Sequence, residues 1–197
     1  MVMTLAYFGS VLGYMTVCSF TPGPGNLLAM NTTQTYGFKR SRRLILGICA
    51  GYLCVQTLCA LAVYGLSALL SQALSVLRYV GAAYMLYLAV HMLRSRPDGD
   101  LQGRDPTFRK GFLLQLVNVK IYFYMTTLLS VYLVPQIHSL GGVLLSGVGV
   151  VAYGSIACLA WAFLGVGLQK VYVRYYRWIN LLLAAFLAEC AWSILRA

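Results

Sequence analysis

One lysine stands inside an apolar stretch in the second half of the chain. Lys120 follows Gln115 and Asn118 and lies ten residues beyond Lys110, which is about 15 Å of helical rise. An ammonium group at that depth in a membrane costs several kcal/mol unless it faces water or a partner. A solute carboxylate, a structural anion or backbone carbonyl groups would each be a suitable partner. We favour solute binding, with Gln115 and Asn118 on one face of the same helix.

A second unusual segment interrupts the first apolar stretch. The run TPGPGN at Thr21–Asn26 contains two prolines and two glycines, and each proline removes a backbone donor and clashes with the preceding turn. As one helix, the stretch up to Tyr36 would be about 50 Å long, against a hydrocarbon core of about 30 Å. We therefore expect a helix broken at Pro22-Gly23-Pro24 near mid-membrane, with a simple kink as the alternative. A broken helix directs free backbone groups at one point, which suits a zwitterionic solute.

These two segments supply the candidate solute-binding residues, which are Thr21, Pro22, Gly23, Pro24, Asn26, Gln115, Asn118 and Lys120. Gln56, Tyr52, Tyr84 and Tyr87 could also line a cavity, although tyrosines in membrane helices more often serve packing or lie at the interface. Glu189 is the only acidic residue within an apolar segment. It could pair with Lys120, carry a proton or remain protonated among lipids, so proton coupling through Glu189 or Lys120 stands beside a structural role.

Metal, cofactor and nucleophilic chemistry have little support. The histidines are His91 and His138, and the six cysteines lie in apolar segments without a Cys-x-x-Cys pair. We therefore expect no metal site, no cofactor and no disulfide. A membrane-embedded enzyme would need an acid/base set near an interface, and a helical scaffold would need neither a buried ion nor a helix break. A non-enzymatic carrier of a small solute fits better than either.

The composition requires contact with lipid. Hydrophobic residues make up 60% of the 197 residues and charged residues only 10%, whereas a soluble domain is about a quarter charged. A spanning helix needs about 20 mostly apolar residues. We predict an all-α polytopic membrane protein with six transmembrane helices, at Leu5–Tyr36, Leu44–Leu70, Leu74–Leu93, Phe112–Val134, Leu140–Leu168 and Trp178–Leu195.

Basic residues predict the orientation of these helices. The net charge is +11, and the basic residues gather in segments 39–43, 94–110 and 170–177. The positive-inside rule then places both termini outside and these segments in the cytoplasm. No segment resembles a nucleic-acid-binding module, so the expected partners are the lipid bilayer and a small solute. A homo-oligomer is left open.

The chain divides into two halves within a single transmembrane domain, 1–197. A linker at 94–109, rich in proline and glycine, separates a first three-helix half at 1–93 from a second at 110–197. Three is an odd number, so the second half enters the membrane from the opposite side. The result is a 3+3 inverted repeat, which secondary transporters use repeatedly. Such a repeat would bring the proline-glycine break and Lys120 together at mid-membrane.

Several short motifs together resemble the lysine/threonine exporter family (LysE/RhtB type) over essentially the whole chain. They are Thr21-Pro22-Gly23-Pro24, Gly37-Phe38-Lys39 with Gly47, Gly81-Ala82-Ala83-Tyr84 with Leu88-Ala89, and the run from Phe112 to Lys120. The resemblance implies a bacterial inner-membrane exporter of small neutral amino acids such as cysteine and O-acetylserine. It implies alternating access coupled to the proton gradient, with homoserine- or threonine-like amino acids as alternative substrates. It places substrate-site roles on Pro22, Gly23, Pro24, Asn118 and Lys120.

Two residues depart from the family pattern. Gly25 stands where a close member of the family has a second asparagine, which leaves Asn26 alone and alters the side chains available to a solute. Glu189 stands where that member has an aromatic residue, which puts a family-wide proton-coupling role for Glu189 in doubt.

Overall fold

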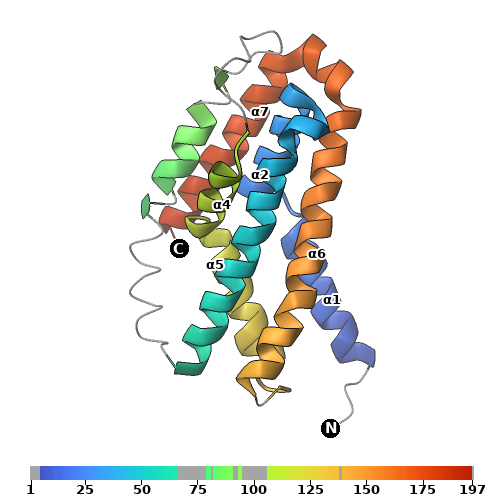
Figure 1. Cartoon of the computed structure of the whole chain (residues 1–197). Coiled ribbons are helices and arrows are strands. Elements are labelled where there is room, and N and C mark those ends of the chain that lie inside the picture. Colours follow the sequence, from blue (N-terminus) through green and yellow to red (C-terminus); the bar gives the residue numbers. More distant parts are fainter. Residues whose placement is uncertain are drawn as a thin grey trace.

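The computed structural model describes residues 5–65, 79–80, 82–90, 93–94, 106–137 and 139–196, which are helical apart from short connections (Figure 1). The helices are α1 (Leu5–Phe20), α2 (Pro24–Gly65), α4 (Phe108–Leu116), α5 (Val119–Thr127), the π-helical η1 (Leu128–Leu133), α6 (Leu140–Gly167) and α7 (Gln169–Arg196). Residues 82–90 are also helical. The all-α prediction is confirmed for this part of the chain.

Within the described residues, two helices are long and apolar enough to cross a membrane, and a bent pair of helices is a third candidate. Pro24–Val63 and Leu140–Gly167 have mean hydropathies of 2.1 and 2.0, and the bent pair Phe108–Leu116 and Val119–Leu133 makes a third candidate. The predicted linker and the third predicted helix lie partly outside the described residues, so six spans in a 3+3 repeat stay a prediction.

Large apolar side chains cover the outer surface of the bundle. Val17, Leu145 and Trp178 are 67%, 75% and 73% exposed, and many further leucine, valine and phenylalanine side chains on α2, α6 and α7 are exposed as well. Soluble monomers rarely expose apolar patches on this scale. These side chains are placed to face lipid acyl chains.

The chain turns back inside α2 at a single residue. The loop predicted between Tyr36 and Leu44 is wrong, because helix continues on both sides of Gly37. Gly37 has φ 73° and ψ 164°, a backbone conformation that glycine adopts without strain. Figure 1 shows the ribbon of α2 changing direction at this point.

Two other predicted boundaries also move. α4 begins at Phe108 rather than Phe112, after a cap in which the Thr107 side chain accepts a hydrogen bond from the backbone of Lys110. α7 begins at Gln169, so the expected loop before Trp178 is helical, with Tyr175 as its one non-helical residue. The fifth predicted span agrees with α6 to within one residue.

Glycines bring α2 into backbone contact with α4 and α6. A Cβ at Gly47 would lie 2.1 Å from the Phe108 carbonyl oxygen, and one at Gly111 would lie 2.2 Å from that of Leu44. On α6, a Cβ at Gly165 would lie 2.4 Å from the Met30 carbonyl oxygen of α2. Small residues permit this close approach of membrane helices.

The segments that carry the basic residues lie at one end of the bundle. The turn of α2, the start of α4 and the α6–α7 junction all lie in the upper part of Figure 1, while the starts of α1 and α6 lie in its lower part. The described basic residues of these segments therefore gather towards one end of the bundle. Which end faces the cytoplasm stays a prediction.

Candidate functional site at two broken helices

The first helix break lies where the sequence predicts it. α1 ends at Phe20 and α2 begins at Pro24, with Thr21, Pro22 and Gly23 outside either helix. Proline suits the first position of a helix, because its missing N–H has no partner there in any case. The break at Pro22-Gly23-Pro24 is therefore confirmed.

Side chains of α2 and α6 donate hydrogen bonds to the carbonyl groups that the break leaves free. The Asn26 side-chain amide donates to the Ser19 carbonyl at 2.8 Å and to the Thr21 carbonyl at 3.3 Å. Trp161 of α6 donates its indole N–H to the Phe20 carbonyl at 3.2 Å. The end of α1 is thus fixed by Asn26, just after the break, and by Trp161, which is far away in the sequence.

The second half of the chain contains a corresponding helix break, for which the sequence gives no proline or glycine signal. α4 ends at Leu116, α5 begins at Val119, and the two are bent by 59°. The predicted continuous helix Phe112–Val134 is therefore wrong. Asn118 has φ −84° and ψ 87°, and its side-chain amide donates to Gln115 Oε1 at 3.0 Å. Asparagine favours such local bonds over the helix, whereas proline and glycine, the usual markers, are missing from 117–119.

The two breaks meet at Lys120, in the first turn of α5. Lys120 Nζ donates to the Thr21 carbonyl at 3.0 Å and to the Pro22 carbonyl at 3.4 Å. Gly23 leaves room for this contact, since a Cβ there would lie 3.0 Å from Nζ. The C-terminal end of a helix carries partial negative charge, which stabilises a nearby cation. The predicted meeting of the first break and Lys120 is confirmed.

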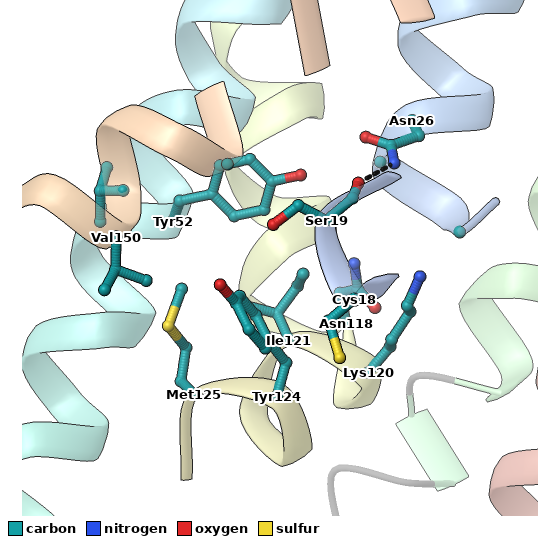
Figure 2. Close-up of a pocket in the computed structure, with 14 residues that line it drawn as sticks. Cys18, Ser19, Asn26, Tyr52, Asn118, Lys120, Ile121, Tyr124, Met125 and Val150 are labelled. Carbon is teal, nitrogen blue, oxygen red and sulfur yellow. Dashed lines mark hydrogen bonds between the residues drawn. The ribbon is translucent and has the colours of Figure 1, made fainter. Parts of the chain in front are cut away.

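A small cavity lies between these groups (Figure 2). Its lining comes from α1, α2, α5, α6 and the two breaks, and comprises Cys18, Ser19, Gly23, Gly25, Asn26, Tyr52, Asn118, Lys120, Ile121, Tyr124, Met125, Val150, Val151 and Gly154. In Figure 2, Asn26 and Lys120 lie on one side of the view and Val150 and Met125 on the other. The cavity offers about 20 Å³ to the centre of a water molecule, which is room for about one water.

Two carboxamide oxygens in this lining have no partner among the described residues. Asn26 Oδ1 and Asn118 Oδ1 are buried and accept no hydrogen bond. Native proteins pair most buried polar atoms, so such atoms call for a ligand or an ordered water. The cavity therefore combines one cationic donor, Lys120, with two carboxamide acceptors and with the hydroxyl groups of Ser19 and Tyr124, which are also buried without a hydrogen-bond partner in the described part of the chain.

Gln115 lies behind the cavity lining and positions Asn118. It is fully buried, and a Cβ at Gly25 would lie 2.3 Å from its Nε2. Gly25 thus makes room for the Gln115 amide, whose oxygen accepts from Asn118. The departure from the family pattern at Gly25 is structurally coupled to the second break.

The other predicted residues divide into two groups. Thr21 and Pro22 contribute carbonyl groups to Lys120, and Pro24 begins α2. The residues of the first break therefore all lie beside the cavity or shape the break next to it. Glu189 is exposed on α7 and is not among the residues that line the cavity.

Several lining residues lie beyond what sequence reasoning identified. Cys18 and Ser19 directly precede the break, and that position is a signal that could have pointed to them. Met125, Val150 and Gly154 lie in ordinary apolar runs of α5 and α6, where sequence does not distinguish a cavity lining from lipid contact. Tyr52, which the sequence offered as a possible lining residue, does line the cavity.

Comparison with known proteins gives consistent matches along the chain. The family model described as LysE type translocator matches residues 16–197. The cysteine/O-acetylserine efflux proteins of Escherichia coli (strain K12) and Shigella sonnei (strain Ss046) are each 35% identical over 191 residues, covering 96% of this chain and 97% of theirs. No solved structure matches.

Proposed function

Since the chain belongs to the LysE type translocator family, we propose that this multi-pass membrane protein exports small neutral amino acids such as cysteine and O-acetylserine. The observation that carries the proposal at the site is the shared cavity of Lys120 and the unpartnered oxygens of Asn26 and Asn118. A cationic donor and neutral acceptors within one small cavity suit the carboxylate and the ammonium group of a zwitterion.

In this proposal Lys120 binds the substrate carboxylate. Its ammonium bonds to the Thr21 and Pro22 carbonyls, and an arriving carboxylate competes with them as a charged and stronger acceptor. Asn26 Oδ1 and Asn118 Oδ1 accept from the substrate ammonium group. Gln115 orients Asn118, and Gly23 keeps the approach to Lys120 open.

The other residues that line the cavity favour a substrate with a small, neutral side chain. Cys18, Ile121, Met125 and Val150 are apolar or weakly polar, and the tyrosines of the cavity offer hydroxyl groups without charge at neutral pH. A charged side chain would lose its hydration there without a counter-ion. A thiol or an acetyl ester fits this chemistry.

The cavity is too small for an amino acid in this conformation, so transport requires movement. Alternating access through relative motion of the two halves supplies it. The Lys120–Thr21 contact joins an element of one half to an element of the other. We propose that the substrate carboxylate weakens this contact and thereby links occupancy to motion.

Coupling to the proton gradient is part of the proposal. Lys120 is the one acidic or basic side chain in the described lining of the cavity, so it is our candidate for the coupling group. The exposed Glu189 is the alternative. We further propose the bacterial inner membrane as the location, with both termini in the periplasm and the basic segments in the cytoplasm.

The test is a substrate panel in proteoliposomes with and without an imposed pH gradient. We expect transport of cysteine and O-acetylserine above that of threonine, homoserine and lysine, accelerated by the gradient. Preference for homoserine or threonine would replace the substrate assignment and keep the exporter. If no amino acid is transported, the proposed function is wrong, and if Lys120→Ala leaves the transport of every tested amino acid intact, the proposed role of Lys120 is wrong.

A further inference from the structure

A second, larger hollow lies at the charged end of the bundle, away from the candidate site. It has a volume of about 610 Å³ and is lined by Lys39, Arg40, Arg42, Arg43, Pro106, Thr107, Phe108 and Arg109. Five of these eight residues are basic. They come from α2 and from the start of α4, which are far apart in the sequence.

Backbone contact forces these cations together. Gly47 and Gly111 hold α2 against α4, with the virtual Cβ of each about 2 Å from a carbonyl oxygen of the other helix. Arg43 is adjacent to Leu44, and Arg109 to Phe108, the residues that these glycines contact, so both cations are kept near the crossing, where like charges repel. Within the described residues the one acidic side chain, Glu189, lies on α7 and does not line the hollow.

The positive-inside rule explains basic residues in each cytoplasmic segment, but it does not explain their convergence on one hollow. All five cationic side chains are exposed, so none is held there by core packing. Arg40 lies over the Tyr36 ring, 5.8 Å from its centroid. Convergence of this kind stabilises an anion more than it stabilises the fold.

Apolar surface continues directly from the hollow towards the middle of the bundle. Leu46 follows Arg42 by four residues on α2, and Leu113 follows Arg109 by four on α4, so each lies one turn deeper on the same face. Leu46 is 61% exposed and Leu113 42% exposed, with Phe108 at the rim 47% exposed. A soluble phosphate would gain nothing from this surface, whereas an acyl chain would cover it.

We propose that this hollow binds the phosphate headgroup of an anionic phospholipid in the cytoplasmic leaflet, with its acyl chains along Leu46 and Leu113. Arginine binds phosphate oxygens through two parallel hydrogen bonds, and basic pockets between membrane helices on the cytoplasmic side suit such headgroups. The lipid would bridge α2 and α4 and offset the repulsion between their cations. The site is independent of which solute is carried.

The experiment compares lipid binding by the whole protein and two charge-matched double variants. Arg43→Gln with Arg109→Gln removes two cations of the hollow, while Arg174→Gln with Arg177→Gln removes two exposed cations of α7. Each protein, in detergent, is titrated with phosphatidylglycerol, with phosphatidylcholine and with inorganic phosphate. Bound lipid is counted by native mass spectrometry, and thermal protection is followed as the shift in Tm.

We expect one phosphatidylglycerol to bind wild type and the α7 variant alike and to raise their Tm. The Arg43/Arg109 variant should bind it about thirtyfold more weakly, since each cation near an anionic lipid surface contributes about fivefold. The proposed site is wrong if the Arg43/Arg109 variant binds phosphatidylglycerol as tightly as wild type, or if the α7 variant loses as much affinity as the Arg43/Arg109 variant does. Equal protection by inorganic phosphate would overturn the assignment to lipid. Because all four substituted side chains are exposed, the variants should fold, and amino-acid transport measured in parallel keeps the outcome separate from the proposed function.

Discussion

Lys120 Nζ lies 3.0 Å from the carbonyl oxygen of Thr21, so a side chain of α5 holds the C-terminal end of α1. Thr21 belongs to the first helix break, and Lys120 lies two residues after Asn118 of the second break. This contact joins the two breaks into one structural unit. The first break provides backbone carbonyl groups beside the cavity, and the start of α5 provides the Lys120 ammonium group.

Replacing Lys120 by alanine should raise the KM for cysteine by about 10- to 100-fold, the range expected for a charge-assisted hydrogen bond. The variant should also lose its discrimination between cysteine and cysteamine, which lacks the carboxylate. Inhibition of transport by both compounds, measured in proteoliposomes, gives the comparison. Lys170→Ala, an exposed change on α7, is the matched control. Unchanged discrimination in Lys120→Ala would show that the lysine is a structural cap for α1.

Replacing Gly25 by alanine should displace the Gln115 amide, because the new Cβ would lie 2.3 Å from Nε2. The displaced atom is the end of a flexible side chain, so the fold should survive while the bond to Asn118 is lost. We expect KM to rise about fivefold, as for one buried hydrogen bond, with little change in Tm. Gly13→Ala, where nothing lies within 4 Å of the new Cβ, should leave both values alone. A large fall in Tm with unchanged KM would contradict the positioning role of Gln115.

Replacing Gly47 by alanine should destabilise the protein, because the new Cβ would lie 2.1 Å from the Phe108 carbonyl oxygen. Backbone atoms cannot move aside as a side chain can, and such overpacking costs about 1–3 kcal/mol. For a chain of this length that is a fall in Tm of about 2–4 °C per kcal/mol. Thermal unfolding in detergent measures it, with Gly149→Ala as a control that meets nothing within 4 Å. Equal Tm values for the two variants would contradict the α2–α4 contact.

Cys18 lines the cavity, whereas Cys54, on α2, does not. In variants that retain one cysteine each, bound O-acetylserine should slow alkylation of Cys18 by iodoacetamide several-fold and leave that of Cys54 unchanged. The physical reason is that the substrate would occupy the space beside the Cys18 thiol. The rates are measured by mass spectrometry of the labelled protein. Equal protection of both cysteines would indicate a global change of conformation, and protection of neither would place the substrate elsewhere.

The first break could be predicted because its cause is local. Pro22 and Pro24 exclude a regular helix whatever surrounds them, and the length of the apolar stretch requires the interruption near mid-membrane. The membrane environment could also be predicted directly, because 60% of the residues are hydrophobic and only 10% are charged. The position of Lys120 within an apolar stretch likewise predicted that its ammonium group binds a partner.

The second break could not be predicted, because Asn118 leaves the helix only in the presence of particular neighbours. Its amide bonds to Gln115, and Gln115 has space only because Gly25 of the first half leaves it free. The turn at Gly37 is an intermediate case: a glycine was visible in the sequence, but helix on both sides of it was not. Cavity residues on α6 carried no signal, since an apolar side chain facing a cavity and one facing lipid have the same composition.

By itself, then, the sequence determined that the chain enters a membrane, that its first helix breaks and that a cation stands within an apolar segment, since each follows from the composition, the backbone chemistry or the solvation of particular residues. Only the tertiary structure decided that the cation bonds to the broken end of α1, that a second break lies opposite the first, and that five basic residues surround one hollow. These are relations between segments far apart in the chain. They depend on which glycines let two backbones touch, and that packing is a property of the whole bundle.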